Sequence, residues 1–231
     1  MLTTEGWGRQ LLSGALLSVE LALCTLPFGL CAGLLLARGQ DSEGSGVARF
    51  CTALVTIFRA LPELLTIFIV YYGGQIALQK LLPLVAITSP VEINGFLAGM
   101  LALTLVFGAF SSEVFKAALH AVPRGQHEAA HALGLSGGKA FVSVVFPQMW
   151  RVALPGLGNL WLVLLKDTSL VSVIALPDLI RQANLAVSAT REPFFFYLAA
   201  FLIYLVASII SGQGLSRLEI RANRPYMVIG K

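Results

Sequence analysis

Five long apolar stretches constrain what this sequence can fold into. They cover residues 11–37, 52–79, 94–118, 152–176 and 194–216. A helix that crosses about 30 Å of hydrocarbon needs about 20 predominantly apolar residues, and each stretch is long enough. The first stretch also exceeds the apolar core of a signal peptide, which is about 7–15 residues long. We therefore expect all five stretches to remain in the membrane.

The composition supports this interpretation. Of the 231 residues, 57% are hydrophobic and only 12% are charged, whereas a soluble domain carries roughly 25% charged residues. The stretches lack the short alternating strands of a membrane β-barrel. We expect an all-α integral membrane protein with five transmembrane helices and a single domain over residues 1–231. The net charge of +4 is too small to indicate a nucleic-acid partner.

The distribution of Lys and Arg predicts the orientation of the spans. Polar connections at 38–49, 80–92, 120–151 and 177–193 separate the apolar stretches, so the two chain ends lie on opposite sides. One side collects nine Lys or Arg residues: Arg38, Arg49, Arg124, Lys139, Arg151, Arg217, Arg221, Arg224 and Lys231. The other side collects four: Arg9, Lys80, Arg181 and Arg191. Because cytoplasmic loops carry the excess of positive charge, we expect the N-terminus outside, and the C-terminus and the 120–151 connection in the cytoplasm.

The 120–151 connection contains two motifs that are typical of enzymes. The sequence LSGGK (135–139) resembles part of an ATPase signature loop, but ATP chemistry also needs a phosphate-binding GxxxxGK[ST] loop. Lys139 is followed by Ala140, and Leu133 stands where the first glycine of that loop would be. We therefore expect no ATP hydrolysis by this chain, and we interpret LSGGK as a glycine-rich turn.

The second motif is HEAAH (127–131), which matches the H-E-x-x-H pattern of zinc proteases. His127 and His131 would share a helix face and Glu128 would be the base. A zinc site needs a third ligand, and the only other histidine, His120, is separated from the pair by Pro123. We expect two surface histidines and no metal, and an intramembrane zinc protease stays as the alternative. An ion-coupled secondary transporter is a further alternative, although the internal repeat it predicts is not apparent.

Local sequence rules predict a helix–turn–helix in this connection. Pro123 suits the first turn of a helix, and Gly134 stands where a left-handed residue ends one. Ser136 can cap a second helix over 137–146, which we expect to stop before Pro147. The alanines of the first helix keep it slim enough to enter a groove on another protein, so the loop is predicted to be a docking element.

The loop and several longer segments resemble the permease subunits of ATP-binding-cassette importers. Glu128, Ala129, Ala130, Gly134 and Pro147 match the family's EAA motif. The segments 58–73, 111–130, 154–176 and 191–205 resemble the polar amino-acid branch, and within it the permeases for histidine, basic amino acids and opines. The resemblance covers nearly the whole chain and implies the type I importer permease architecture.

The resemblance also implies a set of partners. A family member pairs with a sister permease, docks its EAA loop on two cytoplasmic ATPase subunits, and receives substrate from an extracytoplasmic binding protein. The chain would then be a permease in the bacterial inner membrane, with no cofactor of its own, because the ATPase subunits bind the ATP. The substrate would be a polar amino acid, most simply a basic one, or an opine.

Charged residues inside the spans are candidates for the substrate pathway, because charges in the membrane usually face a cavity or a partner. At about 1.5 Å per residue, Glu20 and Glu63 lie about 14–16 Å into their stretches, near the midplane where transporters tend to hold substrate. Arg59 and Glu113 lie at a similar depth nearer the cytoplasm and could pair. Asp167 lies towards the outer side. A structural alternative is that Arg59, one helical turn away, pairs with Glu63.

Overall fold

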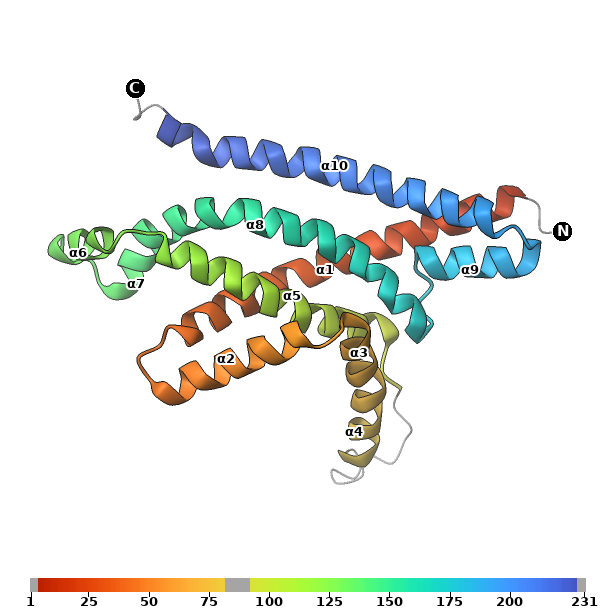
Figure 1. Ribbon diagram of the computed structural model, residues 1–231, viewed down its shortest axis with the longest axis horizontal. Helices are drawn as coiled ribbons and strands as arrows, with labels where there is room; N and C mark the ends of the chain where they lie inside the picture. The colour runs from red at the N-terminus through yellow and green to blue at the C-terminus, as the bar shows by residue number, and fades with distance from the viewer. Residues whose placement is uncertain (1–3, 82–91, 228–231) are drawn as a thin grey trace.

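The computed structural model describes residues 4–81 and 92–227, and it contains helices and no strand within these residues (Figure 1). Five helical segments are long and apolar enough to cross a membrane: Gly6–Gln40, Glu63–Leu81, Gly95–His120, Gly137–Ile174 and Pro193–Asn223. The prediction of an all-α chain with five membrane spans is therefore confirmed. Part of the expected 80–92 connection, residues 82–91, lies outside the described residues, as does Lys231.

The helices follow one another along the chain with short connections. They are α1 (Thr4–Gln40), α2 (Ser45–Ala60), α3 (Glu63–Phe68), a π-helical turn (Ile69–Gly73), α4 (Gly74–Leu81), α5 (Gly95–His120), α6 (Arg124–Ala132), α7 (Gly137–Ala140), a second π-helical turn (Phe141–Val145), α8 (Phe146–Asp167), a 3₁₀ helix (Thr168–Ile174), α9 (Leu179–Thr190) and α10 (Pro193–Met227). The small helices α6 and α7 lie at one end of the bundle, and α9 lies at the other (Figure 1).

The centre of the bundle is the contact between α1 and α5. A Cβ at Gly29 would lie 2.5 Å from Phe107, and a Cβ at Gly108 would lie 3.1 Å from Ala32. Ser111 is fully buried at this contact and donates its hydroxyl to the Gly29 carbonyl oxygen at 3.3 Å. Small residues allow the two backbones to approach this closely, which is a common way to pack helices within a membrane.

The second apolar stretch differs from its prediction. We expected one helix over 52–79, but α2 ends at Ala60, and Leu61 has an extended backbone with φ −80° and ψ 140°. Proline clashes with an α-helical residue before it and lacks an N–H group, so Pro62 ends α2 and starts α3. α2 then runs beside the bundle, while α3 and α4 leave it at a steep angle (Figure 1).

The helix expected over 137–146 also differs. It does not stop before Pro147, because the chain remains helical from Gly137 to Ile174. Pro147 lies in the first turn of α8, directly after the π-helical turn Phe141–Val145. A π-helical turn changes the i→i−4 hydrogen-bond pattern, so a proline placed after it need not break the helix. The loop at this end of the bundle is therefore joined rigidly to α8.

The connection at the other end contains α9, which Asp178 caps. Its carboxylate accepts hydrogen bonds from the backbone N–H groups of Arg181 at 2.9 Å and Ile180 at 3.3 Å. The side chain is buried, and desolvation raises the pKa of Asp178 from 3.8 to about 6, although the backbone hydrogen bonds oppose this shift. The folded protein therefore favours the protonated form more than the unfolded chain does.

We expect Asp178→Asn to stabilise the protein at pH 8, because the asparagine oxygen can still accept the 2.9 Å hydrogen bond from the Arg181 N–H and the side chain cannot ionise. Because the pKa of Asp178 is raised in the folded protein, this residue contributes most to the free energy of unfolding below pH 3.8. The contribution is lost as the pH rises through about 6. A shift of this size corresponds to about 3 kcal/mol. Asp178→Ala removes the cap and should destabilise the protein by about 0.5–2 kcal/mol. Thermal unfolding of the detergent-solubilised variants between pH 5 and 8 measures both effects. If the unfolding midpoints of Asp178→Asn and the wild type differed by the same amount at every pH in this range, the raised pKa of Asp178 would be contradicted.

Candidate functional site

A cavity of about 160 Å³ lies where α3, α5 and α8 meet. Most of its wall is apolar, and it has two carboxylates, those of Glu63 and Asp167. The remaining lining residues are Leu103, Val106, Phe107, Phe110, Leu160, Val163 and Leu164. The cavity is formed entirely by helices of the predicted membrane spans, so the two carboxylates are a polar site in otherwise apolar surroundings.

The breaks in the helices place the two carboxylates. Pro62 ends α2, which makes Glu63 the first residue of α3, where the positive end of the helix dipole favours a carboxylate. Asp167 is the last residue of α8, at the point where the chain tightens into the 3₁₀ helix Thr168–Ile174. Thr168 is fully buried there and donates its hydroxyl to the Leu165 carbonyl at 2.8 Å, which fixes this turn.

Neither cavity carboxylate has an ion-pair partner within the residues that the structure describes. Arg59 pairs instead with Glu113, with 3.3 Å between Nη1 and Oε2, and its guanidinium group also lies 5.8 Å from the centre of the Phe110 ring. The pair between Arg59 and Glu113 that the sequence allowed is thus present, and Arg59 does not neutralise Glu63. A cationic group that entered the cavity would meet two carboxylates without a competing cation in salt-bridge contact.

The structure separates Glu20 from this cavity. Glu20 is exposed on α1 and is not among the residues that line the space around Glu63. Both glutamates lie deep in their stretches, but depth along a helix does not specify the face on which a residue lies. The apolar wall from α5, above all Phe107 and Phe110, was not predicted as part of a site, because its residues have the same character as the rest of that span.

The α6–α7 segment projects from the end of the bundle (Figure 1). Along α6, Glu128 and Ala129 are exposed and Ala130 is the one buried residue. The helix ends as predicted, with Gly134 in left-handed geometry at φ 75°. The Gly134 N–H donates to the His131 carbonyl at 2.9 Å and the Leu135 N–H donates to the Ala130 carbonyl at 3.1 Å, which together form a Schellman motif. Ser136 occupies the N-cap of α7, but its side chain makes no capping hydrogen bond.

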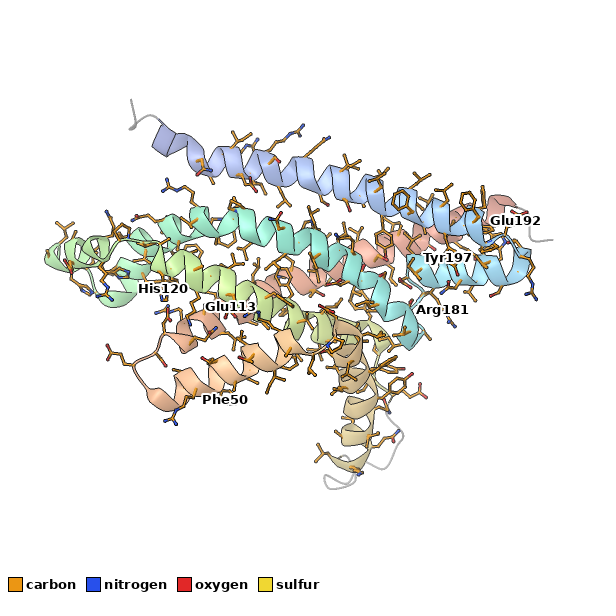
Figure 2. The ribbon with its side chains drawn as sticks, in the orientation of Figure 1. Phe50, Glu113, His120, Arg181, Glu192 and Tyr197 are labelled. Atoms are coloured by element: carbon orange, nitrogen blue, oxygen red, sulfur yellow. The ribbon has the colours of Figure 1, made fainter. Side chains whose placement is uncertain are left out.

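A polar cluster ties this loop to the ends of α1 and α5. His120 Nε2 lies 2.7 Å from an Asp41 carboxylate oxygen, and Lys116 Nζ lies 3.9 Å from the other oxygen. Arg38 stacks over the Phe141 ring at 4.2 Å. His120 and Glu113 project from the same stretch of α5, on the side facing α2 (Figure 2). The sequence did not predict the contacts of Asp41 and Arg38, because their partners are about 80–100 residues away along the chain.

The two histidines of the HEAAH motif are exposed on α6. His127 lines an open polar cavity of about 510 Å³ with Asp41 and His120, whereas His131 is not among its lining residues. In the described ranges 4–81 and 92–227, no group of three His, Cys, Asp or Glu side chains could hold a metal ion. The geometry does not support the zinc-protease alternative, and the expectation of no metal stays a prediction.

Comparison with known proteins gives a consistent result. Residues 6–221 match the family described as "Binding-protein-dependent transport system inner membrane component". The chain is 42% identical over 226 residues to the arginine ABC transporter permease protein ArtQ of Escherichia coli (strain K12), covering 93% of this chain and 95% of that protein. It is 39% identical to the nopaline transport system permease protein NocQ of Agrobacterium fabrum, covering 95% of this chain and 93% of that protein.

Solved structures agree with this result. A crystal structure of an amino acid ABC transporter with histidines has a TM-score of 0.80 and 30% identity, and the match covers 95% of this chain and 97% of that one. The MetNI methionine ABC transporter, in inward-facing form, has a TM-score of 0.76 at 15% identity, with 95% and 99% covered, which shows the shared fold.

Proposed function

Because the chain belongs to the family of inner membrane components of binding-protein-dependent transport systems, we propose that it carries cationic amino acids or opines through the membrane. It is a permease subunit of an amino-acid ABC importer, and its relatives include permeases named for arginine and nopaline. The observation that carries the proposed substrate class is the cavity with Glu63 and Asp167, neither of which forms an ion pair with another described residue.

The chemistry of the cavity suits a cationic side chain. An arginine or lysine side chain loses its hydration on entering the membrane, and an uncompensated charge there is expensive. A carboxylate offers a charge-assisted hydrogen bond, which is bidentate when the ligand carries a guanidinium group. The apolar walls from α5 and α8 would contact the methylene stem of the same side chain. Glu63 and Asp167 are therefore proposed to contact substrate directly, while Arg59 and Glu113 hold the helices around them.

The proposed partners follow the organisation of the family. The permease pairs with a sister permease, docks on two cytoplasmic ATPase subunits, and takes substrate from an extracytoplasmic binding protein. The ATPase subunits bind and hydrolyse ATP, so this chain needs no cofactor and performs no covalent chemistry. Docking uses the exposed face of α6 with Glu128 and Ala129, while Ala130, Gly134 and Pro147 set the shape of the element.

Uptake by the assembled transporter tests the substrate class. Vesicles that contain the complete complex are given labelled arginine together with unlabelled histidine, lysine, glutamine or an opine. Competition by cationic compounds and not by glutamine supports the proposal. Glutamine that competes as well as lysine would contradict it.

The proposed orientation places the N-terminus outside and the C-terminus in the cytoplasm. We expect a cysteine at Gly125, in α6, to be labelled from the cytoplasmic side only, and a cysteine at Ser188, in α9, from the outside only. Both positions are exposed and lie at opposite ends of the bundle. The background replaces the native Cys24, Cys31 and Cys51 with alanine. A membrane-impermeant maleimide added to intact cells or inverted vesicles reads out the side. Labelling of the Gly125 cysteine from outside would reverse the orientation.

A further inference from the structure

An apolar groove of about 320 Å³ lies between α1, α8 and α10. It is separate from the cavity of Glu63, because the two share no lining residue. Two of the three tryptophans of the chain, Trp150 and Trp161, form its α8 wall. The other lining residues are Leu23, Leu26, Leu30, Leu154, Leu157, Gly158, Ser211, Gly214, Leu215 and Leu218. All lie on helices that are long and apolar enough to cross a membrane.

The contact between α8 and α10 gives the groove its shape. A Cβ at Gly158 would lie 3.4 Å from a methyl carbon of the Leu215 side chain, so this side chain covers α8 at that glycine. A Cβ at Gly214 would have no atom within 4 Å, so the groove is open on this side of α10. A slim, flexible hydrocarbon chain fits a space that is narrow at one glycine and open at another.

Positive charges collect at one end of the groove. On α10, Arg217 precedes the lining residue Leu218, Arg221 lies one helical turn beyond it, and both arginines are exposed. On α8, Arg151 follows Trp150 at the same end of the groove and already has an interaction of its own. Glu219 lies between the two α10 arginines, and its Oε1 would be 3.7 Å from a Cβ at Gly158. Arg217 and Arg221 follow the lining residue Gly214 at helical i+3 and i+7 spacing, so they lie on the same side of α10 as that residue.

We infer that this groove binds an anionic phospholipid, with an acyl chain against Trp150 and Trp161 and the phosphate group at Arg217 and Arg221. Basic pockets between membrane helices on the cytoplasmic side are suited to anionic headgroups. Arginine recognises phosphate oxygens with paired hydrogen bonds, which adds specificity to the charge attraction. The inference uses a site distinct from the proposed substrate cavity, so it can fail while the transport function holds.

Tryptophan quenching by brominated lipids tests this site. Trp7→Phe in every variant leaves Trp150 and Trp161 as the only tryptophans. The full-length chain, assembled with its partner subunits after replacing their tryptophans, is placed in phosphatidylcholine vesicles with a minor fraction of brominated phosphatidylglycerol or brominated phosphatidylcholine. We expect the anionic lipid to quench at a much lower mole fraction. Replacing Arg217 and Arg221 with glutamine should reduce this preference by about fivefold for each arginine removed.

Two glycine variants on α10 distinguish lipid binding in the groove from lipid contact with the rest of the helix surface. Gly214→Leu fills the groove and should remove the preference for the anionic lipid, and Gly212→Leu, at a glycine that does not line the groove, should keep it. Equal quenching by the two lipids at all mole fractions would show ordinary lipid contact and overturn the inference. An absence of quenching by either lipid would show that protein, such as a second permease, covers the groove, and would overturn it as well.

Discussion

Glu63→Gln is expected to reduce arginine uptake by the assembled transporter far more than glutamine uptake. Glu63 lines the cavity between α3, α5 and α8 and has no ion-pair partner within the described residues. A cationic substrate would therefore lose one of its two carboxylates. Removing one member of a buried charged pair costs about 2–5 kcal/mol, which is a factor of about 30 or more in the rate of uptake at low substrate concentration. A neutral substrate does not use that charge and should lose much less.

The matched control for this variant is Glu20→Gln. It makes the same chemical change at a similar depth, but at an exposed position on α1 that does not line the cavity. Initial rates of arginine and glutamine uptake are compared for both variants at equal amounts of protein in the membrane. Equal losses for the two substrates in Glu63→Gln, or no loss for either, would remove Glu63 from the substrate site. If Glu20→Gln also reduced arginine uptake far more than glutamine uptake, the selectivity would not come from the cavity of Glu63.

Glu128→Arg or Gly134→Asp is expected to leave the permease folded but to separate ATP hydrolysis from uptake. Glu128 is exposed on α6, so reversing its charge changes the docking face and not the core. Gly134 has φ 75°, and an added Cβ would meet no atom within 4 Å, so a side chain there would extend from the surface of the proposed docking element. Aspartate tolerates left-handed geometry better than most residues, at a cost of about 1 kcal/mol. Uptake should fall by at least about tenfold, the effect of about 1.4 kcal/mol of lost docking.

The measurement compares ATP hydrolysis and arginine uptake in the same vesicles. The control combines His127→Ala with His131→Ala, which removes both exposed histidines from the same helix and should leave uptake nearly unchanged. Loss of uptake in the double alanine variant, together with one zinc atom per chain in the wild type, would favour a metal role for this loop. Parallel loss of membrane expression in Glu128→Arg or Gly134→Asp would indicate a folding role instead of coupling.

The sequence predicted features that depend on short-range rules. Gly134 adopts the left-handed conformation expected at a helix end, and Arg59 pairs with Glu113 as their similar depth suggested. At Pro62 the long apolar stretch 52–79 conceals a helix break, although the proline itself disfavours a helical residue before it. At Pro147 the sequence predicted a helix end that the structure does not have. The π-helical turn before this proline lets the helix continue, and such a turn has no clear sequence signal.

The composition of the cavity depends on which faces of the helices pack together. α1 and α5 are apolar on nearly all sides, so periodicity does not show which side of α1 faces the bundle or that Glu20 does not line the cavity of Glu63. Asp167 was placed towards the outer side by its depth, and only the packing of both α3 and α8 against α5 brings it to the cavity of Glu63. Which residues share a cavity is decided by how the helices pack together, and local sequence patterns do not encode that packing.

The most direct test of the central claim is the energy source for arginine accumulation by the reconstituted complex. ATP is enclosed in vesicles that contain the permeases and ATPase subunits, and labelled arginine is supplied outside with the binding protein. We expect accumulation to require hydrolysable ATP, to stop with a non-hydrolysable analogue, and to continue when an ionophore collapses all ion gradients. Accumulation that needs an ion gradient and proceeds without ATP or the ATPase subunits would contradict the assignment as an ABC importer permease and would indicate a secondary transporter.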